Sequence, residues 1–262
     1  MNKIISLHIH KTAGSTLHSI ISRQYKSDEV IFANLEGVDN VKKEIINNKR
    51  NISQLKCVHG HFVFGWHQFL GVEWKYITVI REPRSRLISD YYYNLSNTNA
   101  HHHQFAKNKS FNEFLLNPRN ILSDNALCRF ISGDITTPVG ELSENVVKKA
   151  LKNIDNHFIH IGFTEKFDDF LVKSKKILGW NRLYYKSLNR TKTNRGRVTI
   201  DDGLLSERIK YDVQLYNELR NRDNEYVRAT KFNFLVLVHK LQCRFYSLIY
   251  PLWSRYNKKT MK

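Results

Sequence analysis

Short apolar runs alternate with segments of helical periodicity along the chain. Directly after the first run, the apolar positions Leu17, Ile20 and Ile21 follow helical spacing from Gly14 onward. Such alternation is typical of a parallel sheet whose strands are joined by crossover helices. The pattern predicts an α/β fold, a single domain with a central parallel sheet flanked by helices. Five runs are predicted as buried strands: 4–9, 30–32, 56–59, 76–80 and 158–162.

Two further helices are predicted in the second half of the chain. Apolar spacing places one at about 167–178 and another around Ile209, Val213 and Tyr216. The stretch 94–109 is polar and holds three consecutive histidines, so we expect an exposed loop over one face of the sheet. Consecutive side chains cannot all point at one ion, and we expect no metal there.

Size and charge limit the kinds of partner. A chain of 262 residues fits one domain, which we predict to span residues 1–262. Its 42 Lys and Arg against 24 Asp and Glu give a net charge of +18. This excess favours anionic partners such as nucleotides, nucleic acid, acidic glycans or anionic lipid surfaces, and charge alone does not choose among them.

The cysteines and the first residues bear on location. Cys57, Cys128 and Cys243 are too few and too scattered to indicate a disulfide framework or a zinc site, which favours a reducing compartment. The first apolar run carries His8 and His10, so no signal peptide or anchor is expected. We therefore predict a cytoplasmic protein, with the Golgi lumen as the alternative if the chain is an excised catalytic domain.

The first informative segment is 7–17, where a strand ends in a small-residue turn and opens a helix. Backbone N–H groups at a helix N-terminus bind phosphate, and Ala13 and Gly14 let a ligand approach the backbone. The alternative is an ordinary capped helix, and a Walker A loop is excluded because the lysine precedes the glycine. The predicted anion-binding residues are Lys11, Thr12, Ala13, Gly14, Ser15 and Thr16.

The second segment is 76–93, a buried strand that delivers Arg81 at its carboxyl end. Pro83 then starts a helix that carries Ser89, eight residues after the arginine. This arrangement brings a guanidinium and a hydroxyl within reach of one phosphate. The alternative interpretation is a plain strand followed by a basic helix.

The third segment, 57–65, places His59 and His61 on either side of a glycine at another predicted strand end. A neutral imidazole can take the proton of an attacking hydroxyl, a role typically worth about 10²- to 10⁴-fold in rate. Since alternate strand positions face alike, the other interpretation makes one of the two histidines an ordinary core residue.

Together these segments resemble the motifs of PAPS-dependent carbohydrate sulfotransferases, where PAPS is 3′-phosphoadenosine 5′-phosphosulfate. The first resembles Pro-Lys-Thr-Ala-Gly-Thr/Ser-Thr, with His10 in place of Pro, and the second resembles Arg-Asp-Pro-x-x-Arg-x-x-Ser-x-Tyr, with Glu82 in place of Asp. The His-Gly-His segment is most similar to the heparan sulfate 2-O-sulfotransferase group. The resemblance implies a P-loop-like nucleotide-binding sulfotransferase fold, PAPS as sulfuryl donor and no metal.

The same resemblance implies roles for individual residues. His61 would be the catalytic base and His59 a supporting residue, while Lys11 would stabilise charge on the leaving phosphate. The segment 158–170 resembles the family's strand-turn-helix with a Gly-x-Thr-Glu core, which we interpret as scaffold. The basic segment 186–197 resembles the loop that closes over the nucleotide, and its candidate phosphate donors are Arg190, Thr191 and Lys192.

The acceptor is expected to be a hydroxyl of a carbohydrate, either an acidic polysaccharide or a glycolipid, and no specific nucleic acid is expected. The C-terminal segment 232–262 is basic and aromatic. It is interpreted either as a core-packing helix with a basic tail or as a peripheral contact with the inner membrane surface. Two other functions remain open at this point: a non-catalytic glycan- or nucleic-acid-binding protein, and a P-loop kinase-like phosphotransferase.

Overall fold

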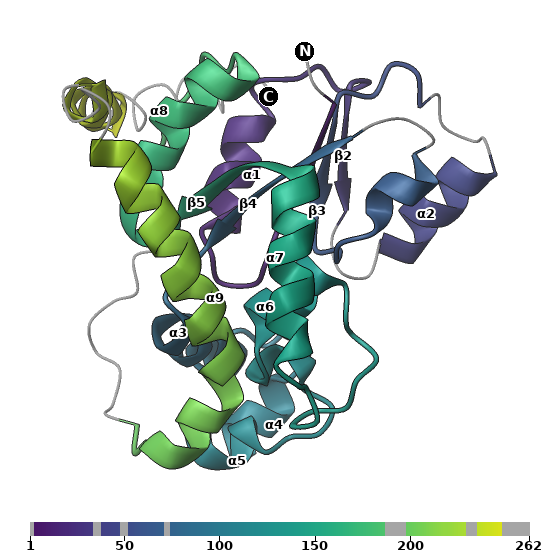
Figure 1. Ribbon diagram of the computed structural model, residues 1–262, viewed down its shortest axis with the longest axis vertical. Coiled ribbons are helices and arrows are strands. Elements are labelled where there is room, and N and C mark those ends of the chain that lie inside the picture. The colour runs from purple at the N-terminus through teal and green to yellow at the C-terminus, as the bar shows by residue number, and fades with distance from the viewer. Residues whose placement is uncertain are drawn as a thin grey trace, which may run out of the picture.

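A single parallel sheet organises the protein (Figure 1). The computed structural model describes residues 3–33, 38–47, 52–70, 74–186, 198–228 and 235–247. The strands lie in the order β2-β3-β1-β4-β5, and all neighbours pair in parallel. The predicted α/β class and all five predicted strands are confirmed: β1 (Ile4–Leu7), β2 (Val30–Ala33), β3 (Cys57–Gly60), β4 (Lys75–Ile80) and β5 (Phe158–Phe163).

Helices cover both faces of the sheet, as continuous apolar strands require. On one face α1 (Gly14–Ile21) and α8 (Phe167–Leu178) pack against Ile4, Ile77 and Val79. The other face of the sheet packs against four helices, namely α2 (Val38–Ile46), α6 (Ala126–Ser132), α7 (Asn145–His157) and α9 (Asp202–Arg228). Strand residues are therefore buried from both sides.

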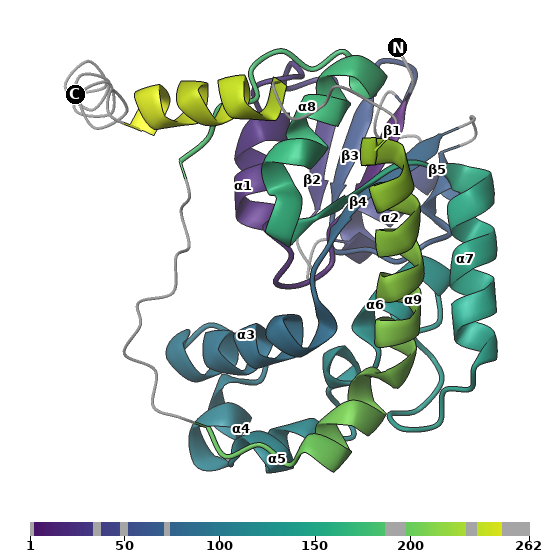
Figure 2. The ribbon, with the colours of Figure 1, turned by 60° about the vertical axis from the view of Figure 1, so that its left-hand side comes forward.

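A third group of helices lies beyond the carboxyl ends of the strands, in the lower part of Figure 2. It consists of α3 (Pro83–Ser96), α4 (His103–Asn108) and α5 (Phe111–Leu115), which share a hydrophobic core with the start of α9. Short 3₁₀ turns complete the described elements at Trp66–Phe69, Ile121–Ser123 and Thr164–Lys166. These three helices therefore face the edge of the sheet at which the strands end.

The exposed loop predicted for 94–109 is limited to the turn at 97–102, and the prediction is wrong for the residues on either side. Helix α3 continues to Ser96, and α4 begins at His103. Asn94 and His103 are buried, with relative exposures of 4% and 9%. The Asn94 side chain accepts a hydrogen bond from the His102 backbone N–H, and the His103 ring donates to the Asn94 carbonyl oxygen at 2.9 Å. These polar groups can be buried because the end of α3 and the start of α4 supply each other's hydrogen-bond partners.

The C-terminal helix (residues 235–247) packs one face on the domain through Val236, His239 and Cys243. In the part of the chain that the structure describes, no helix is both long and apolar enough to cross a bilayer. The predicted membrane-surface contact, the cytoplasmic location and the single domain over 1–262 stay predictions. The outward face of this helix carries large apolar side chains: Leu235, Leu237, Val238, Leu241 and Phe245.

A buried carboxylate joins α6 to α9. The side chain of Asp212 accepts hydrogen bonds from the backbone N–H groups of Cys128 at 2.8 Å and Leu127 at 3.1 Å. In return, Asn125 accepts from the backbone of α9. Helix α6 also accepts a hydrogen bond from the segment after β3, since the Phe64 N–H donates to the Phe130 carbonyl oxygen at 2.8 Å. The hydrogen bonds of Asp212 and Asn125 therefore fix α6, and α6 in turn holds the chain that follows the His-Gly-His segment.

We predict that Asp212→Ala lowers the free energy of unfolding by about 2 to 5 kcal/mol, because two buried N–H groups lose their acceptor. Urea denaturation measures the loss. Asp202→Ala is the matched control on the same helix, since it removes only the exposed ion pair with Arg84 and should cost about 0 to 1 kcal/mol. Equal losses in the two variants would contradict the prediction.

Candidate active site

Three strand ends meet at one edge of the sheet. Leu7, at the end of β1, lies opposite Gly60 of β3 on one side and Thr78 of β4 on the other. The chain leaves β1 toward β2 on one side and leaves β4 toward β5 on the other, so β1 and β4 flank the point where the strand order reverses. Ligands of open α/β sheets bind outside the carboxyl ends of strands at such a point. All three segments singled out in the sequence start here.

The turn between β1 and α1 has an unusual backbone. Lys11 and Ala13 both have positive φ values, 67° and 66°. A non-glycine residue in this region costs on the order of 1 kcal/mol or more, and such strain gathers at functional sites. The Thr12 hydroxyl holds the turn by donating to the Ile9 carbonyl oxygen at 2.8 Å. Helix α1 begins without a side-chain cap, which suits a helix start that receives an anion.

Gly14 is required for a reason other than the one expected. A Cβ at this position would lie 1.5 Å from Nε2 of His8, so only glycine fits beneath that ring. The sequence interpretation assigned the open space over Gly14 to a ligand. In the structure the His8 imidazole takes it, and the first turn of α1 is therefore tied to a histidine of the strand end.

The two predicted phosphate-binding segments touch each other. Arg81 directly follows β4, and its Nη1 donates a hydrogen bond to the Lys11 carbonyl oxygen at 3.3 Å. The Lys11 ammonium lies 4.0 Å from the centre of the Tyr93 ring on α3. Ser89 lies on α3 four residues before Tyr93 and is half-buried. The glycine turn and Arg81 therefore lie in contact at the strand ends.

The turn that carries Arg81 is fixed by two glutamates. The Glu82 side chain caps α3 by accepting from the backbone N–H groups of Arg84 at 2.8 Å and Ser85 at 2.7 Å. Glu165 accepts from the Glu82 N–H at 2.9 Å, and the Thr164 hydroxyl donates to the Ile80 carbonyl oxygen. This supports the scaffold role expected of the Gly-x-Thr-Glu segment. It also shows that Glu82 keeps the capping function of a carboxylate at this position.

Four histidines form a stack across the strand ends. His8 stacks on His59 with ring centres 5.4 Å apart and on His61 at 4.0 Å, and His10 stacks on the far side of His61 at 4.1 Å. Sequence analysis singled out His59 and His61 but gave no role to His8 and His10. The parallel pairing of β1 and β3 brings the two pairs together, because alternate residues of neighbouring strands face alike.

Burial keeps these rings neutral. It lowers the pKa of His59 to about 3 and holds the pKa values of His8 and His10 well below the ordinary 6.5. The neighbouring histidines act in the same direction, and Arg86 and Lys11 add to the effect on His10. Burial also lowers the pKa of His61, against a backbone hydrogen bond that raises it. At neutral pH the stack therefore offers lone pairs rather than positive charges.

Hydrogen bonds separate the two predicted histidines. Nδ1 of His61 lies 3.0 Å from the His8 carbonyl oxygen, which can only accept, so Nδ1 carries the proton and Nε2 keeps its lone pair. His59 is 2% exposed, and its Nδ1 lies 2.9 Å from the Ser6 hydroxyl inside the sheet. His61 therefore presents a lone pair at the strand edge, whereas His59 is buried inside the sheet at the end of the stack.

Several buried polar atoms beside the stack have no hydrogen-bond partner among the described residues. They are Nε2 of His10, Nε and Nη1 of Arg86 and both carboxylate oxygens of Asp90. Burial raises the pKa of Asp90, against the opposing effects of Arg86 and Lys11. Native proteins rarely leave such groups unsatisfied, so bound water or a ligand is the expected partner. The site therefore has polar capacity suited to an anionic nucleotide and a hydroxylated acceptor.

Some predicted and unpredicted features lie elsewhere. Arg190, Thr191 and Lys192 fall outside the described residues, so their predicted contact with the nucleotide stays a prediction.

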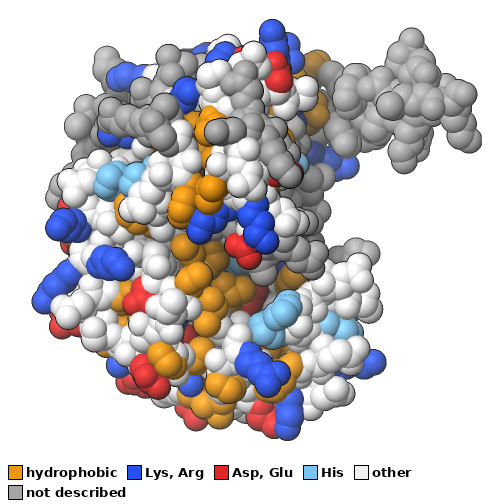
Figure 3. Space-filling view, turned by 90° about the vertical axis from the view of Figure 1, so that its right-hand side faces the viewer, with side chains coloured by type: hydrophobic (Ala, Val, Ile, Leu, Met, Phe, Trp, Pro, Cys, Tyr) orange, Lys and Arg blue, Asp and Glu red, His pale blue; other side chains and the backbone are white. Residues whose placement is uncertain are grey.

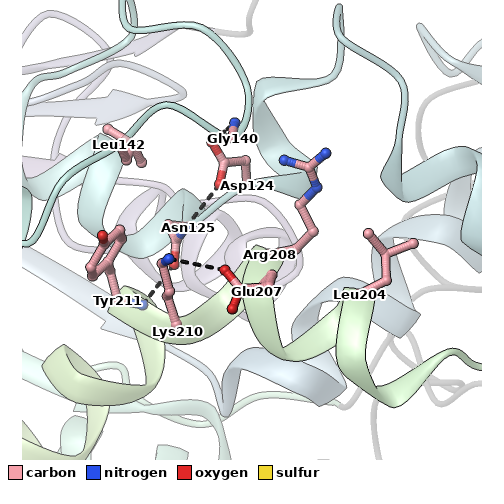
Figure 4. Close-up of a pocket in the computed structure, with 9 residues that line it drawn as sticks. All are labelled: Asp124, Asn125, Gly140, Leu142, Leu204, Glu207, Arg208, Lys210 and Tyr211. Carbon is pink, nitrogen blue, oxygen red and sulfur yellow. Dashed lines mark hydrogen bonds and ion pairs between the residues drawn. The ribbon is translucent and has the colours of Figure 1, made fainter.

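A pocket of about 290 Å³ lies between α9 and the start of α6 (Figure 4). None of the predicted site residues lines it, and its Asp124 is already paired with buried Arg129. We assign the active site to the strand ends and not to this pocket.

The positive charge is not gathered into one surface stripe on the face shown in Figure 3. There the Lys and Arg side chains stand singly or in small groups among polar atoms, and histidines lie beside hydrophobic side chains. A continuous basic stripe is the usual footprint of nucleic-acid binding. This face therefore gives no support to a nucleic-acid partner.

Comparison with known proteins places the chain. The family model for galactose-3-O-sulfotransferase matches residues 1–221. No protein of curated function matches significantly. Among solved structures, the chain is similar to mouse sulfotransferase SULT7A1 complexed with PAP, at 13% identity and a TM-score of 0.41. That alignment covers 80% of this chain and 64% of the mouse chain.

The family match covers the whole candidate site, from the Lys11 turn to Glu165, and extends into α9. It agrees with the resemblance of the motifs to carbohydrate sulfotransferases. The chain belongs to the galactose-3-O-sulfotransferase family.

Proposed function

We propose that the protein transfers a sulfuryl group from PAPS to a hydroxyl of a carbohydrate and that His61 is the general base. The supporting observation is the tautomer of His61. Its Nδ1–H points at the His8 carbonyl oxygen, so the lone pair of Nε2 is left to receive a proton. A neutral imidazole fixed in this way is what deprotonation of a sugar hydroxyl requires.

PAPS, when bound, would supply the sulfuryl group for the acceptor oxygen and would leave as adenosine 3′,5′-bisphosphate. His61 Nε2 takes the hydroxyl proton in that step. Lys11 and the N-terminus of α1 stabilise the negative charge on the leaving phosphate, and Arg81 with Ser89 binds the 3′-phosphate. Catalysis in this scheme comes from positioning and electrostatic stabilisation, as in phosphoryl transfer.

The choice of His61 over His59 follows from accessibility and basicity. His59 is buried beneath the stack, and its pKa of about 3 makes it a weak proton acceptor. His61 lies half-buried at the strand edge, where burial lowers its pKa and the hydrogen bond to the His8 backbone raises it. We assign His59 to positioning, since through His8 it supports the ring that receives the proton.

For the acceptor we propose a galactose-containing carbohydrate, with a glycolipid or an acidic polysaccharide as the carrier. The family's description supports the galactose 3-hydroxyl as the first candidate. The net charge of +18 favours a carrier with negative charge. Transfer of labelled sulfate from PAPS to a panel of β-galactosides, polysaccharides and glycolipids, with product linkage analysis, tests this choice.

Replacing the base should affect turnover and not donor binding. We expect His61→Ala to lower kcat by about 10²- to 10⁴-fold, since proton removal by a positioned base is worth that much. Affinity for adenosine 3′,5′-bisphosphate, measured by calorimetry, should stay nearly unchanged. His101→Ala, at an exposed histidine outside the stack, is the matched control. Wild-type turnover in His61→Ala would remove His61 from the mechanism.

Replacing Arg81 should discriminate between nucleotides. Because we assign its guanidinium to the 3′-phosphate, Arg81→Ala should weaken binding of adenosine 3′,5′-bisphosphate much more than binding of 5′-AMP. Arg84→Ala provides the control in the same turn, where the side chain is exposed and paired with Asp202. If both nucleotides lose affinity equally in Arg81→Ala, the arginine acts only through the Lys11 turn that it contacts.

The pH dependence of kcat/KM should report the neutral base. Since burial lowers the pKa of His61 below 6.5, the acid limb of the profile should have its midpoint below pH 6.5. The buried histidines also have folded pKa values below their unfolded ones, so stability is lost as pH falls below about 6.5. Recovery of activity on return to neutral pH separates titration from unfolding. A reversible midpoint at or above pH 6.5 would contradict the assignment.

A further inference from the structure

Away from the active site, three side chains that can bind a metal converge where the C-terminal helix meets α8. Asp168 lies in the first turn of α8, while His239 and Cys243 lie one turn apart on the C-terminal helix. In Figure 2 this helix, in yellow, runs beside α8. One ligand atom from each residue lies within 4.8 Å of the others. Neither the family nor the sulfotransferase reaction accounts for this cluster.

The spacing of the ligand atoms fits a tetrahedral ion. Nε2 of His239 lies 3.4 Å from Oδ1 of Asp168 and 3.5 Å from Sγ of Cys243. Around a tetrahedral Zn²⁺ with ordinary bond lengths, the N–O edge is about 3.4 Å and the N–S edge about 3.6 Å. The two measured distances match these edges without rearrangement. His239 and Cys243 are four residues apart on one helix, a spacing that places their side chains on the same face.

The geometry does not fit a nucleophilic triad. A Cys-His-Asp triad uses one ring nitrogen for the thiol and the other for the carboxylate. Here the same nitrogen, Nε2 of His239, faces both Asp168 and Cys243. A single nitrogen cannot relay a proton between them. Nor is its 3.4 Å contact with the carboxylate a good hydrogen bond, since such bonds are usually 2.7 to 3.2 Å long.

Charge and surroundings also suit a divalent ion. His239 is only 5% exposed, and Cys243 and Asp168 are partly buried. A thiolate and a carboxylate together neutralise Zn²⁺, so the filled site carries no net charge into this buried position. The Tyr185 hydroxyl donates to Oδ1 of Asp168 at 3.2 Å, and outer contacts of this kind orient metal ligands.

We propose that Asp168, His239 and Cys243 bind a Zn²⁺ ion that fastens the C-terminal helix to the domain. The matched family region ends at residue 221, before this helix begins. Its other contacts include packing of Tyr246 on Tyr184, with ring centres 4.4 Å apart. The ion joins this helix to α8, while water completes the fourth coordination position.

Cobalt is the probe for this site, because Co²⁺ replaces Zn²⁺ and absorbs light. The metal-free chain, kept reduced, is titrated with Co²⁺. We expect a single equivalent to bind, with visible bands of a tetrahedral ion and a near-ultraviolet thiolate-to-cobalt band, and Zn²⁺ to displace it. Cys243→Ser should abolish the thiolate band, and His239→Gln and Asp168→Asn should each weaken binding by more than about 10-fold.

Two variants are matched controls. Cys57→Ala removes a thiol that is fully buried in the sheet, and Asp169→Asn changes the carboxylate next to Asp168. Both should bind Co²⁺ as the wild type does. Absence of the thiolate band in the wild type would overturn the proposal, as would its persistence in Cys243→Ser. Cobalt bound without that band would point to other histidines, such as the His101–His103 triplet, and would also overturn it.

A second measurement tests the attachment itself and does not depend on activity. Hydrogen exchange of the 235–247 amides should slow when Zn²⁺ is added to the metal-free wild type. In Cys243→Ser the same addition should change nothing. Equal exchange with and without Zn²⁺ in the wild type would show that the ion does not fasten the helix.

Discussion

The register of β1 between its two neighbours is the constraint on which the site depends. Leu7 and Gly60 end β1 and β3 at the same level, and Leu7 also lies opposite Thr78 of β4, which continues to Ile80. A shift of β1 by a single residue would turn its side chains to the other face of the sheet. The histidine stack, the Lys11 turn and Arg81 would then no longer meet. Helices on both faces fix this register, because residues of β1 contribute to two separate cores.

The electrostatics of the site follow from placing neutral rings beside fixed cations. Burial, the neighbouring histidines and nearby cations all disfavour a charged imidazole on His10. Lys11 and Arg86 beside these rings can attract an anionic ligand. Negative charge brought in by such a ligand acts on the imidazoles in the opposite direction. In the mechanism that we propose, a bound donor therefore favours the protonated ring when His61 receives the hydroxyl proton.

Local patterns predicted the sheet well and the long-range contacts poorly. Each strand is a short apolar run, and the helix 167–178 matches α8 to the residue. The contacts of His8 and His10 were missed because they depend on pairing across the sheet, and those of Arg86 because its partner Leu122 is 36 residues away. The polar stretch around Asn94 was misjudged since its partners are backbone groups, which leave no trace in composition. Likewise, Cys243 looked isolated because Asp168 lies far away in the sequence.

The direction of the ring nitrogens explains why two histidine-containing clusters in one protein suit different chemistry. In His61 the two nitrogens are divided, with Nδ1 committed to a carbonyl oxygen and Nε2 left with a lone pair at the strand edge. In His239 one nitrogen faces a thiol and a carboxylate together. The first arrangement can accept a proton and pass it on, because its other side is held by a fixed acceptor. The second lacks this division and instead brings three potential ligand atoms to one point, as binding of a metal ion requires.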